Sequence, residues 1–186
     1  MGSHSDLEEK VVESTRIYEG RVVSLRRDSL LLPSGKRFDR EVVEHRGAVA
    51  AVPLLADDVV VLVRQYRHAA GEVLLEIPAG TLNFGENPED CMRRELVEET
   101  GYRPKRLEKL LTLYLAPGYS SELMHIYLAT DLVETGTSPD EDEFIEVVKF
   151  DLSEVLKMVF ESKIRDAKTA CGILAYCLRK GDHSDG

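Results

Sequence analysis

Residues 80–102 read GTLNFGENPEDCMRRELVEETGY, and this stretch is the most informative part of the chain. Its second half carries three carboxylates, at Glu95, Glu98 and Glu99. Each residue of an α-helix advances by about 100°, so these side chains fall within roughly a third of the helical circumference. Like charges at this spacing repel one another. Because Mg²⁺ takes oxygen ligands and commonly bridges carboxylates to phosphates, the pattern predicts a divalent-metal site for a phosphate-containing substrate.

The flanking residues predict where this helix begins and ends. Asn87 is suited to cap its first turn, and Pro88 is suited to its first position. Gly101 fits the left-handed conformation that follows many helices. Arg94 lies four residues before Glu98 and can pair with it. The short pattern EExxG alone is also compatible with a solvated acidic helix that carries an ordinary salt bridge.

The complete spacing is far more specific than its parts. Five residues separate the first two fixed positions, and seven separate the second from the third. In chain order, the fixed positions are Gly80, Glu86, Arg94, Glu95, Leu96, Glu98, Glu99 and Gly101. This arrangement resembles the signature of the Nudix hydrolase superfamily. The family prefers an aliphatic residue at the last position, where this chain has the bulky, half-apolar Tyr102.

Composition and charge exclude several other classes of protein. The chain has 186 residues, of which 43% are hydrophobic and 31% charged, as expected for one globular domain with a sizeable core. Its net charge of −10 argues against nonspecific binding to nucleic acid or to an anionic membrane, because both require a basic surface. There is no apolar run of about 20 residues and no signal-peptide pattern. We therefore expect a cytoplasmic protein without nucleic-acid or membrane partners.

The cysteines give no sign of a disulfide framework or a zinc site. Cys91, Cys171 and Cys177 are odd in number and include no Cys-x-x-Cys pair. Buried, reduced thiols are the expectation.

Strand-like and helix-like runs follow one another in an order typical of an α+β layered domain with a mixed sheet. Helical spacing also occurs at 152–161 and 166–179. Residues 1–14 are predicted to be a disordered or tag-derived tail, and 15–46 an N-terminal β extension. Strand patterns occur at 21–32, 37–45, 47–55, 59–66, 73–77, 107–115, 122–130 and 143–150.

Further segments are similar to the ADP-ribose pyrophosphatase branch of the Nudix superfamily. Pro117 lies 16 residues after Gly101, at a position that resembles a marker of this branch. Taken singly, each of these segments has an ordinary explanation as a turn, a charged strand or a solvated loop. The other segments are VRQYRH at 63–68, LLEIPAG at 74–80, APGYSSE at 116–122 and PDEDEFIEV at 139–147.

The resemblance implies a Nudix-type α/β/α sandwich for residues 47–182, preceded by the β extension. In this branch the extension is swapped across a homodimer whose active sites draw on both chains. The sequence supports a partner for the extension independently, because an isolated hairpin is marginal in water and apolar residues such as Val22, Leu25 and Leu30 need a surface to cover them. We therefore expect a homodimer.

The resemblance also implies roles at the metal. Glu95 and Glu99 would hold Mg²⁺, or Mn²⁺, together with the carbonyl of Ala79, and Glu143 would be a further ligand. Glu98 would be a ligand or an orienting group. Glu141 would take a proton from the attacking water, although any acid of residues 140–143 could serve as this base.

Other residues are expected to contact the substrate or to support the motif. Arg67 is the preferred phosphate ligand, because a guanidinium fork matches phosphate oxygens. Arg46 is a second candidate, Glu122 could accept hydrogen bonds from ribose, and Glu76 could line the pocket. The residues with a structural role in the motif are Gly80, Glu86, Arg94 and Gly101.

These expectations define a metal-dependent hydrolase that cleaves ADP-ribose to AMP and ribose 5-phosphate by water attack. Hydrolysis of other nucleoside diphosphate sugars, such as ADP-glucose or GDP-mannose, is the nearest alternative. A non-catalytic Nudix-fold module that binds a nucleotide is a second alternative. Such a module would be expected to lose carboxylates of the motif, whereas Glu95, Glu98 and Glu99 are all present here.

Overall fold

The computed structural model describes residues 7–136 and 144–182, and the chain divides into two compact units. The first unit contains residues up to Gly47 together with Tyr114–Leu123. The second contains Ala48–Leu113 and the residues from Met124 onward. The assignment of all residues from 47 to 182 to one domain therefore did not anticipate that 114–123 belongs with the N-terminal residues.

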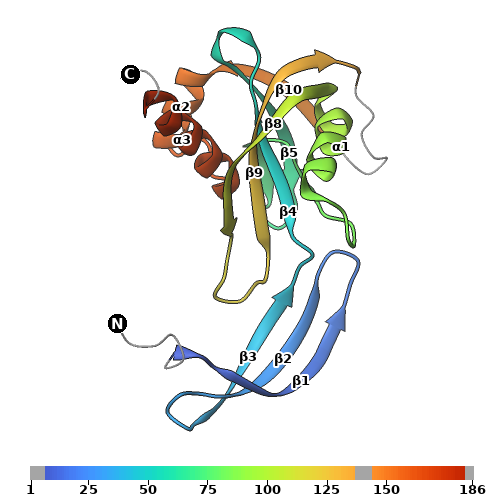
Figure 1. Ribbon diagram of the computed structural model, residues 1–186, viewed down its shortest axis with the longest axis vertical. Helices are drawn as coiled ribbons and strands as arrows, with labels where there is room; N and C mark the ends of the chain where they lie inside the picture. Colours follow the sequence, from blue (N-terminus) through green and yellow to red (C-terminus); the bar gives the residue numbers. More distant parts are fainter. Residues whose placement is uncertain (1–6, 137–143, 183–186) are drawn as a thin grey trace. The chain divides into compact units, whose positions relative to one another are not determined.

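The first unit is an antiparallel sheet of three strands in the order β1-β2-β3 (Figure 1). A tight turn joins β2 and β3, in which Gly35 adopts a φ of 80° and its amide donates to the carbonyl of Leu32. The strands are β1 (Lys10–Glu19), β2 (Ser24–Leu31) and β3 (Arg37–Glu44).

The prediction of a tail over residues 1–14 was wrong at its C-terminal end, because β1 begins at Lys10. All ten positions of β1 are exposed, so the strand has no buried face. Its apolar residues also stand side by side, as at Val11 and Val12, instead of alternating. A strand of this kind lacks the period-two pattern by which strands are found in a sequence.

The segment Tyr114–Leu123 joins the first unit along strand β3. The amide of Val43 donates to the carbonyl of Tyr119 at 2.8 Å, and the amide of Ser121 donates to the carbonyl of Val43 at 3.0 Å. The segment thereby covers part of an open strand edge, which is otherwise free to pair with another chain.

The second unit contains two sheets. One has the strand order β7-β4-β9-β8, and the other has the order β10-β5-β6. β4 pairs with β9 in parallel and with β7 in antiparallel orientation, so the predicted mixed sheet is confirmed. The strands are β4 (Ala48–Pro53), β5 (Val59–Arg67), β6 (Glu72–Glu76), β7 (Ala79–Thr81), β8 (Tyr102–Tyr114), β9 (Leu123–Glu134) and β10 (Ile145–Asp151).

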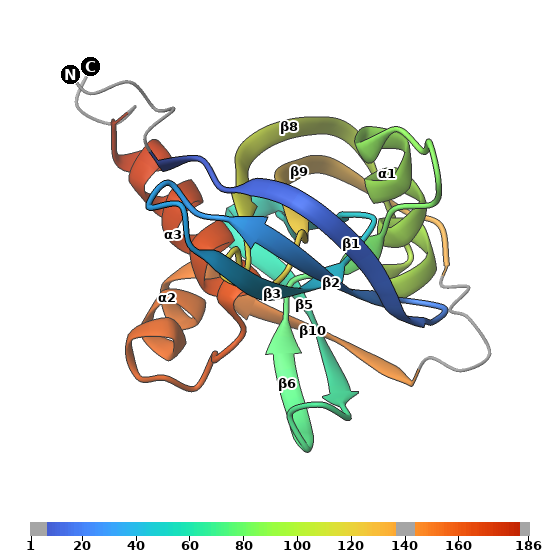
Figure 2. The ribbon, with the colours of Figure 1, turned by 90° about the horizontal axis from the view of Figure 1, so that it is seen from below.

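Helices cover both sides of the strands in the second unit. Figures 1 and 2 show α1 on one side and α2 and α3 on the other, which is the α/β/α arrangement expected. Within the described part of the chain, no helix has the length and apolar character that crossing a membrane would require. The helices are α1 (Pro88–Thr100), α2 (Leu152–Phe160) and α3 (Ala167–Asp182), and a short 3₁₀ turn covers Ala56–Asp58.

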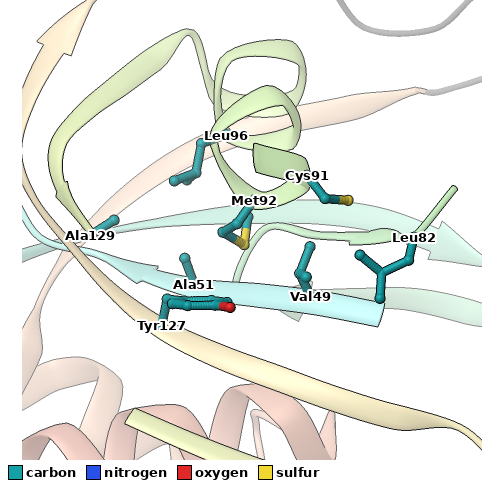
Figure 3. Packing of buried hydrophobic residues seen from close by; sticks show 8 residues of the cluster. All are labelled: Val49, Ala51, Leu82, Cys91, Met92, Leu96, Tyr127 and Ala129. Atoms are coloured by element: carbon teal, nitrogen blue, oxygen red, sulfur yellow. The ribbon is translucent and has the colours of Figure 1, made fainter. Parts of the chain in front are cut away.

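The core between α1 and the sheet fixes the position of the helix that carries the motif. Met92 and Leu96 point from α1 toward Val49 and Ala51 of β4 and toward Tyr127 of β9 (Figure 3). All five residues are buried. Burial of a side chain of this size contributes about 1.5–3 kcal/mol. Rotation of α1 about its axis would expose this face, so the orientation of the acidic face follows from the packing.

Helix α3 packs closely on the other side of the sheet. A Cβ atom on Gly172 would lie 3.1–3.2 Å from side-chain atoms of Val52, Ile126 and Ile77. Glycine at this position therefore allows α3 to approach β4 and β9.

The cysteine prediction holds in part. All three thiols are free, and Cys91 is buried, but Cys171 and Cys177 are only partly buried.

Candidate active site

Local sequence signals determine the ends of helix α1 as predicted. The side chain of Asn87 accepts a hydrogen bond from the amide of Glu89 at 2.8 Å, and Pro88 occupies the first helical position. Gly101 ends the helix in the left-handed conformation, with φ of 74°. Because both ends are fixed, the carboxylates of the last two turns have a defined height along the helix axis.

Arg94 is the centre of a charged cluster on the exposed side of α1. Its guanidinium lies 2.8 Å from carboxylate oxygens of Glu95 and Glu98 and 3.2 Å from Glu86. Glu86 in turn accepts from the amide of Asn83 at 2.8 Å, which fixes the loop before the helix. Burial would lower the pKa of Arg94, but its hydrogen bonds to Glu86 and Glu98 and the charge of Glu95 raise it strongly. The geometry suits the bracing role predicted for Glu86 and Arg94.

Glu99 and Glu95 meet the backbone of β7 at adjacent residues. Glu99 is 4% exposed, and its Oε2 accepts from the amide of Ala79 at 3.0 Å. A Cβ atom on Gly80 would lie 2.0 Å from the carboxyl carbon of Glu95, so this carboxylate packs directly against the glycine. Only a residue without a side chain allows this approach. The structure thus brings together Ala79, Gly80, Glu95 and Glu99.

The donor groups at this point fit a hard divalent cation. All of them are oxygens, and Glu95 and Glu99 bring two negative charges to the backbone of β7. Among the residues that the structure describes, no three acidic, histidine or cysteine side chains already stand at metal-binding distances. Glu95, Glu99 and the carbonyl of Ala79 are the groups that would hold the ion. The predicted ligand Glu143 and the predicted base Glu141 lie outside the described residues.

A buried group of charges lies next to this point, and we call it the Arg67 network. Arg67 binds Glu76 through two hydrogen bonds of 2.8 Å, from Nε and from Nη2. Lys168 donates to the same carboxylate and lies 3.0 Å from Asp166. The members of the Arg67 network are Arg67, Glu76, Asp166 and Lys168.

Charges in the network hold Glu76 ionised although it is only 1% exposed. Burial would raise the pKa of Glu76, but hydrogen bonds from Arg67 and the charge of Lys168 lower it. The hydrogen bonds that Arg67 donates to Glu76 raise the pKa of Arg67 against the effect of burial, and the charge of Glu99 adds to this rise. Arg67 is therefore electrostatically coupled to the predicted metal ligand Glu99.

Sequence reasoning found Arg67 and Glu76 but missed Lys168 and Asp166. Lys168 is 92 residues from Glu76 in sequence, and no local pattern links the two. One signal was present, because Lys168 shares the buried face of α3 with Gly172 at helical spacing. A lysine on such a face requires a buried partner.

Two of the predicted substrate ligands belong to the first unit. Arg46 donates to the carbonyl of Arg21 at 3.2 Å, and the amide of Glu122 donates to Ser120 Oγ at 3.2 Å. Their contacts with a substrate stay predictions.

Two protein-family models match the chain. The model of the NUDIX domain matches residues 44–170, more than half of the chain. The model described as the nucleoside diphosphate sugar hydrolase N-terminal domain matches residues 9–43. The chain therefore belongs to the Nudix hydrolase family.

Several characterised relatives match most of the chain. The ADP-ribose pyrophosphatase of Bacillus subtilis strain 168 is 41% identical, with 90% of this chain and 91% of that protein covered. A methanol dehydrogenase activator of Bacillus methanolicus is 39% identical, with 89% and 91% covered. A GDP-mannose pyrophosphatase of Cronobacter sakazakii is 42% identical over a shorter region, with 72% and 78% covered.

A solved structure confirms the fold class. The crystal structure of an ADP compounds hydrolase superimposes with a TM-score of 0.82 at 25% identity, and the match covers 97% of both chains.

Proposed function

We propose that this protein is a divalent-metal-dependent pyrophosphohydrolase that cleaves ADP-ribose to AMP and ribose 5-phosphate. The observation that carries the proposal is the convergence of Glu95 and Glu99 on the backbone of Ala79 and Gly80. The Bacillus subtilis relative with this activity in its name shares 41% of its residues across nearly the whole chain. A binding module would have no use for an intact set of carboxylates.

Hydrolysis of a diphosphate requires neutralised charge and a positioned water molecule. When bound at Glu95, Glu99 and the Ala79 carbonyl, Mg²⁺ or Mn²⁺ supplies this neutralisation and makes water more acidic. Arg67 binds phosphate oxygens through the part of its guanidinium that Glu76 does not occupy. Glu141 takes the proton of the attacking water, and Glu98, which pairs with Arg94, is the alternative base.

A substrate panel tests the proposal directly. Phosphate release, coupled to a phosphatase that acts on the phosphomonoester products, is measured on ADP-ribose, ADP-glucose, GDP-mannose, NADH and coenzyme A. We expect the highest kcat/KM for ADP-ribose and no turnover without a divalent cation. A higher kcat/KM for GDP-mannose would overturn the choice of substrate but not that of the reaction.

The second candidate function is the hydrolysis of GDP-mannose, which the 42% identity to the Cronobacter enzyme favours. The same panel separates the two substrates. A nucleotide sensor would instead bind ADP-ribose without turnover and without Mg²⁺, as a calorimetric titration in the presence of a chelator would show.

The first unit also supports a homodimer as the working form of a cytoplasmic enzyme. Edge strand β1 exposes more than half of the surface of Val11, Val12, Ile17 and Tyr18, and an open strand edge with exposed apolar residues is a common site of association. A second copy of the chain would cover this surface. We expect light scattering to give a dimer at micromolar concentration and deletion of residues 1–46 to give a monomer. A full-length monomer would refute the dimer.

A further inference from the structure

Arg67 is the exposed end of the Arg67 network. The exposed fraction of the side chain is 1% for Glu76, 9% for Lys168 and 39% for Arg67. Three of its four members are thus largely removed from water, while the guanidinium keeps an accessible face. Buried charges are costly even when they are paired, and apolar residues of similar size often replace them without loss of stability. The presence of these buried charges therefore indicates a functional role for Arg67, the exposed member of the network.

Glu76 is held from two sides at once. Its Oε1 and Oε2 accept from Nε and Nη2 of Arg67, and its Oε2 also accepts from Nζ of Lys168. Lys168 is itself held by Asp166 at 3.0 Å. This arrangement orients the carboxylate so that both oxygens face the guanidinium. Arg67 uses Nε and Nη2 to bind Glu76, which leaves Nη1 of this partly exposed side chain for a ligand.

Hydrogen bonds join the two segments that carry Glu76 and Lys168. The amide of Ile77, next to Glu76, donates to Thr169 Oγ1 at 2.9 Å. The amide of Thr169 donates to Asp166 at 3.0 Å, which closes the first turn of α3. The start of α3 is therefore hydrogen-bonded to the residue that follows β6. These bonds keep the backbone of Lys168 close to that of Glu76.

We infer that Lys168 is a positioning residue that orients Arg67, through Glu76, to bind the diphosphate of the substrate. This inference rests on the proposed role of Arg67 in diphosphate binding. Lys168 also balances the charge of Glu76 and Asp166, so that Arg67 keeps its own positive charge for the ligand. Without Lys168, two carboxylates would compete for one guanidinium and draw it away from the substrate.

Lys168→Met removes this charge while it keeps most of the side-chain length. We expect KM for the substrate to rise about tenfold, since hydrogen bonds to charged groups are among the stronger ones, and kcat to change much less. Lys180→Met is the matched control on the same helix, because Lys180 is exposed and pairs with Asp58. Its KM should equal that of the wild type. If Lys168→Met fails to fold, Lys168→Gln, which removes the charge but keeps a polar group beside Glu76, replaces it in every comparison.

A double-mutant cycle distinguishes positioning from a purely structural role. If Lys168 acts through Arg67, Lys168→Met should add nothing to the KM of an Arg67→Met variant. The same four proteins are then compared by the rise in melting temperature that ADP-ribose causes. This second readout does not depend on turnover. Additive effects in the cycle would overturn the inference and leave the proposed function intact. An Arg67→Met variant with normal KM would overturn both the role of Arg67 and the inference, and a wild type inactive on the substrate panel would overturn the proposed function.

Discussion

Replacement of Gly80 with alanine should displace a metal ligand while it leaves the fold intact. The new Cβ would lie 2.0 Å from the carboxyl carbon of Glu95 and 2.2 Å from its Oε1. Ordinary contact with a Cβ begins near 3.4 Å, so the carboxylate must withdraw by about 1.4 Å. The Cγ of Glu95 would also lie 2.3 Å from the new Cβ, so the side chain must rotate as a whole from its Cβ outward, a movement that does not require α1 to shift. Gly80 does not have a left-handed φ, so alanine also fits its backbone.

A shift of this size is large for catalysis and small for folding. A misplacement of about 1 Å can cost about 100-fold in rate when the geometry of the reacting groups depends on it. We therefore expect turnover of Gly80→Ala to fall about 100-fold at fixed Mg²⁺. The Mg²⁺ concentration for half-maximal activity should rise, because one ligand no longer reaches the ion in its preferred position. The melting temperature should fall by less than about 4 °C, which corresponds to less than about 1 kcal/mol.

The assay is steady-state hydrolysis of ADP-ribose across a range of Mg²⁺ concentrations, with thermal unfolding measured on the same samples. Gly181→Ala is the control, because a Cβ there meets nothing within 4 Å and the residue lies in α3. Wild-type activity and Mg²⁺ dependence in Gly80→Ala would show that Glu95 is not a ligand. A large loss of stability would show that the carboxylate cannot move, and would refute the expected separation of folding from catalysis.

Three further results are expected. Glu99→Gln should lower kcat by at least about 100-fold with unchanged or slightly higher melting temperature, because it keeps the shape of the side chain but removes a ligand charge; near-normal activity at saturating Mg²⁺ would exclude Glu99 as a ligand. The pKa of Glu76 is lowered in the folded state by Arg67 and Lys168, so its ionisation stabilises the fold above the unfolded pKa, about 4.3, and this contribution is lost as the pH falls. The stability difference between wild type and Glu76→Gln, measured by urea unfolding from pH 7 to pH 3, should therefore shrink in acid, and a constant difference would contradict the ion pairing. Burial above all, with the charge of Glu86, raises the pKa of the Cys91 thiol to about 12, so iodoacetamide at pH 8 should leave Cys91 unmodified in the native protein and alkylate it in urea, as mass spectrometry would show.

The helix of the motif could be predicted almost completely from its own residues. Its cap at Asn87, its first residue Pro88 and its left-handed end at Gly101 are all local features, and all three are confirmed. The spacing of Glu95 and Glu99 also predicted that both face the same neighbour. Local sequence is sufficient here because a capped helix requires no information from distant residues.

Features that depend on long-range pairing could not be predicted. Strand β1 has no buried face, β7 is only three residues long, and the segment 114–123 joins the first unit through hydrogen bonds to Val43. The contact between Lys168 and Glu76 spans 92 residues. Tertiary context determines each of these, and neither propensity nor periodicity records it.

The structure also explains how the chain tolerates the carboxylates that would repel one another in an isolated helix. Arg94 pairs with two of the carboxylates, and the backbone of β7 holds the third. Glu98 pairs with Arg94, Glu99 accepts from the amide of Ala79, and Glu95 contacts Arg94 while it rests on Gly80. The helix can therefore hold its acidic face in place before any metal binds, and the binding energy of the ion is not required to fold the site. Preorganised ligands of this kind lower the cost of binding a metal-bound diphosphate, because little reorganisation remains when the substrate arrives.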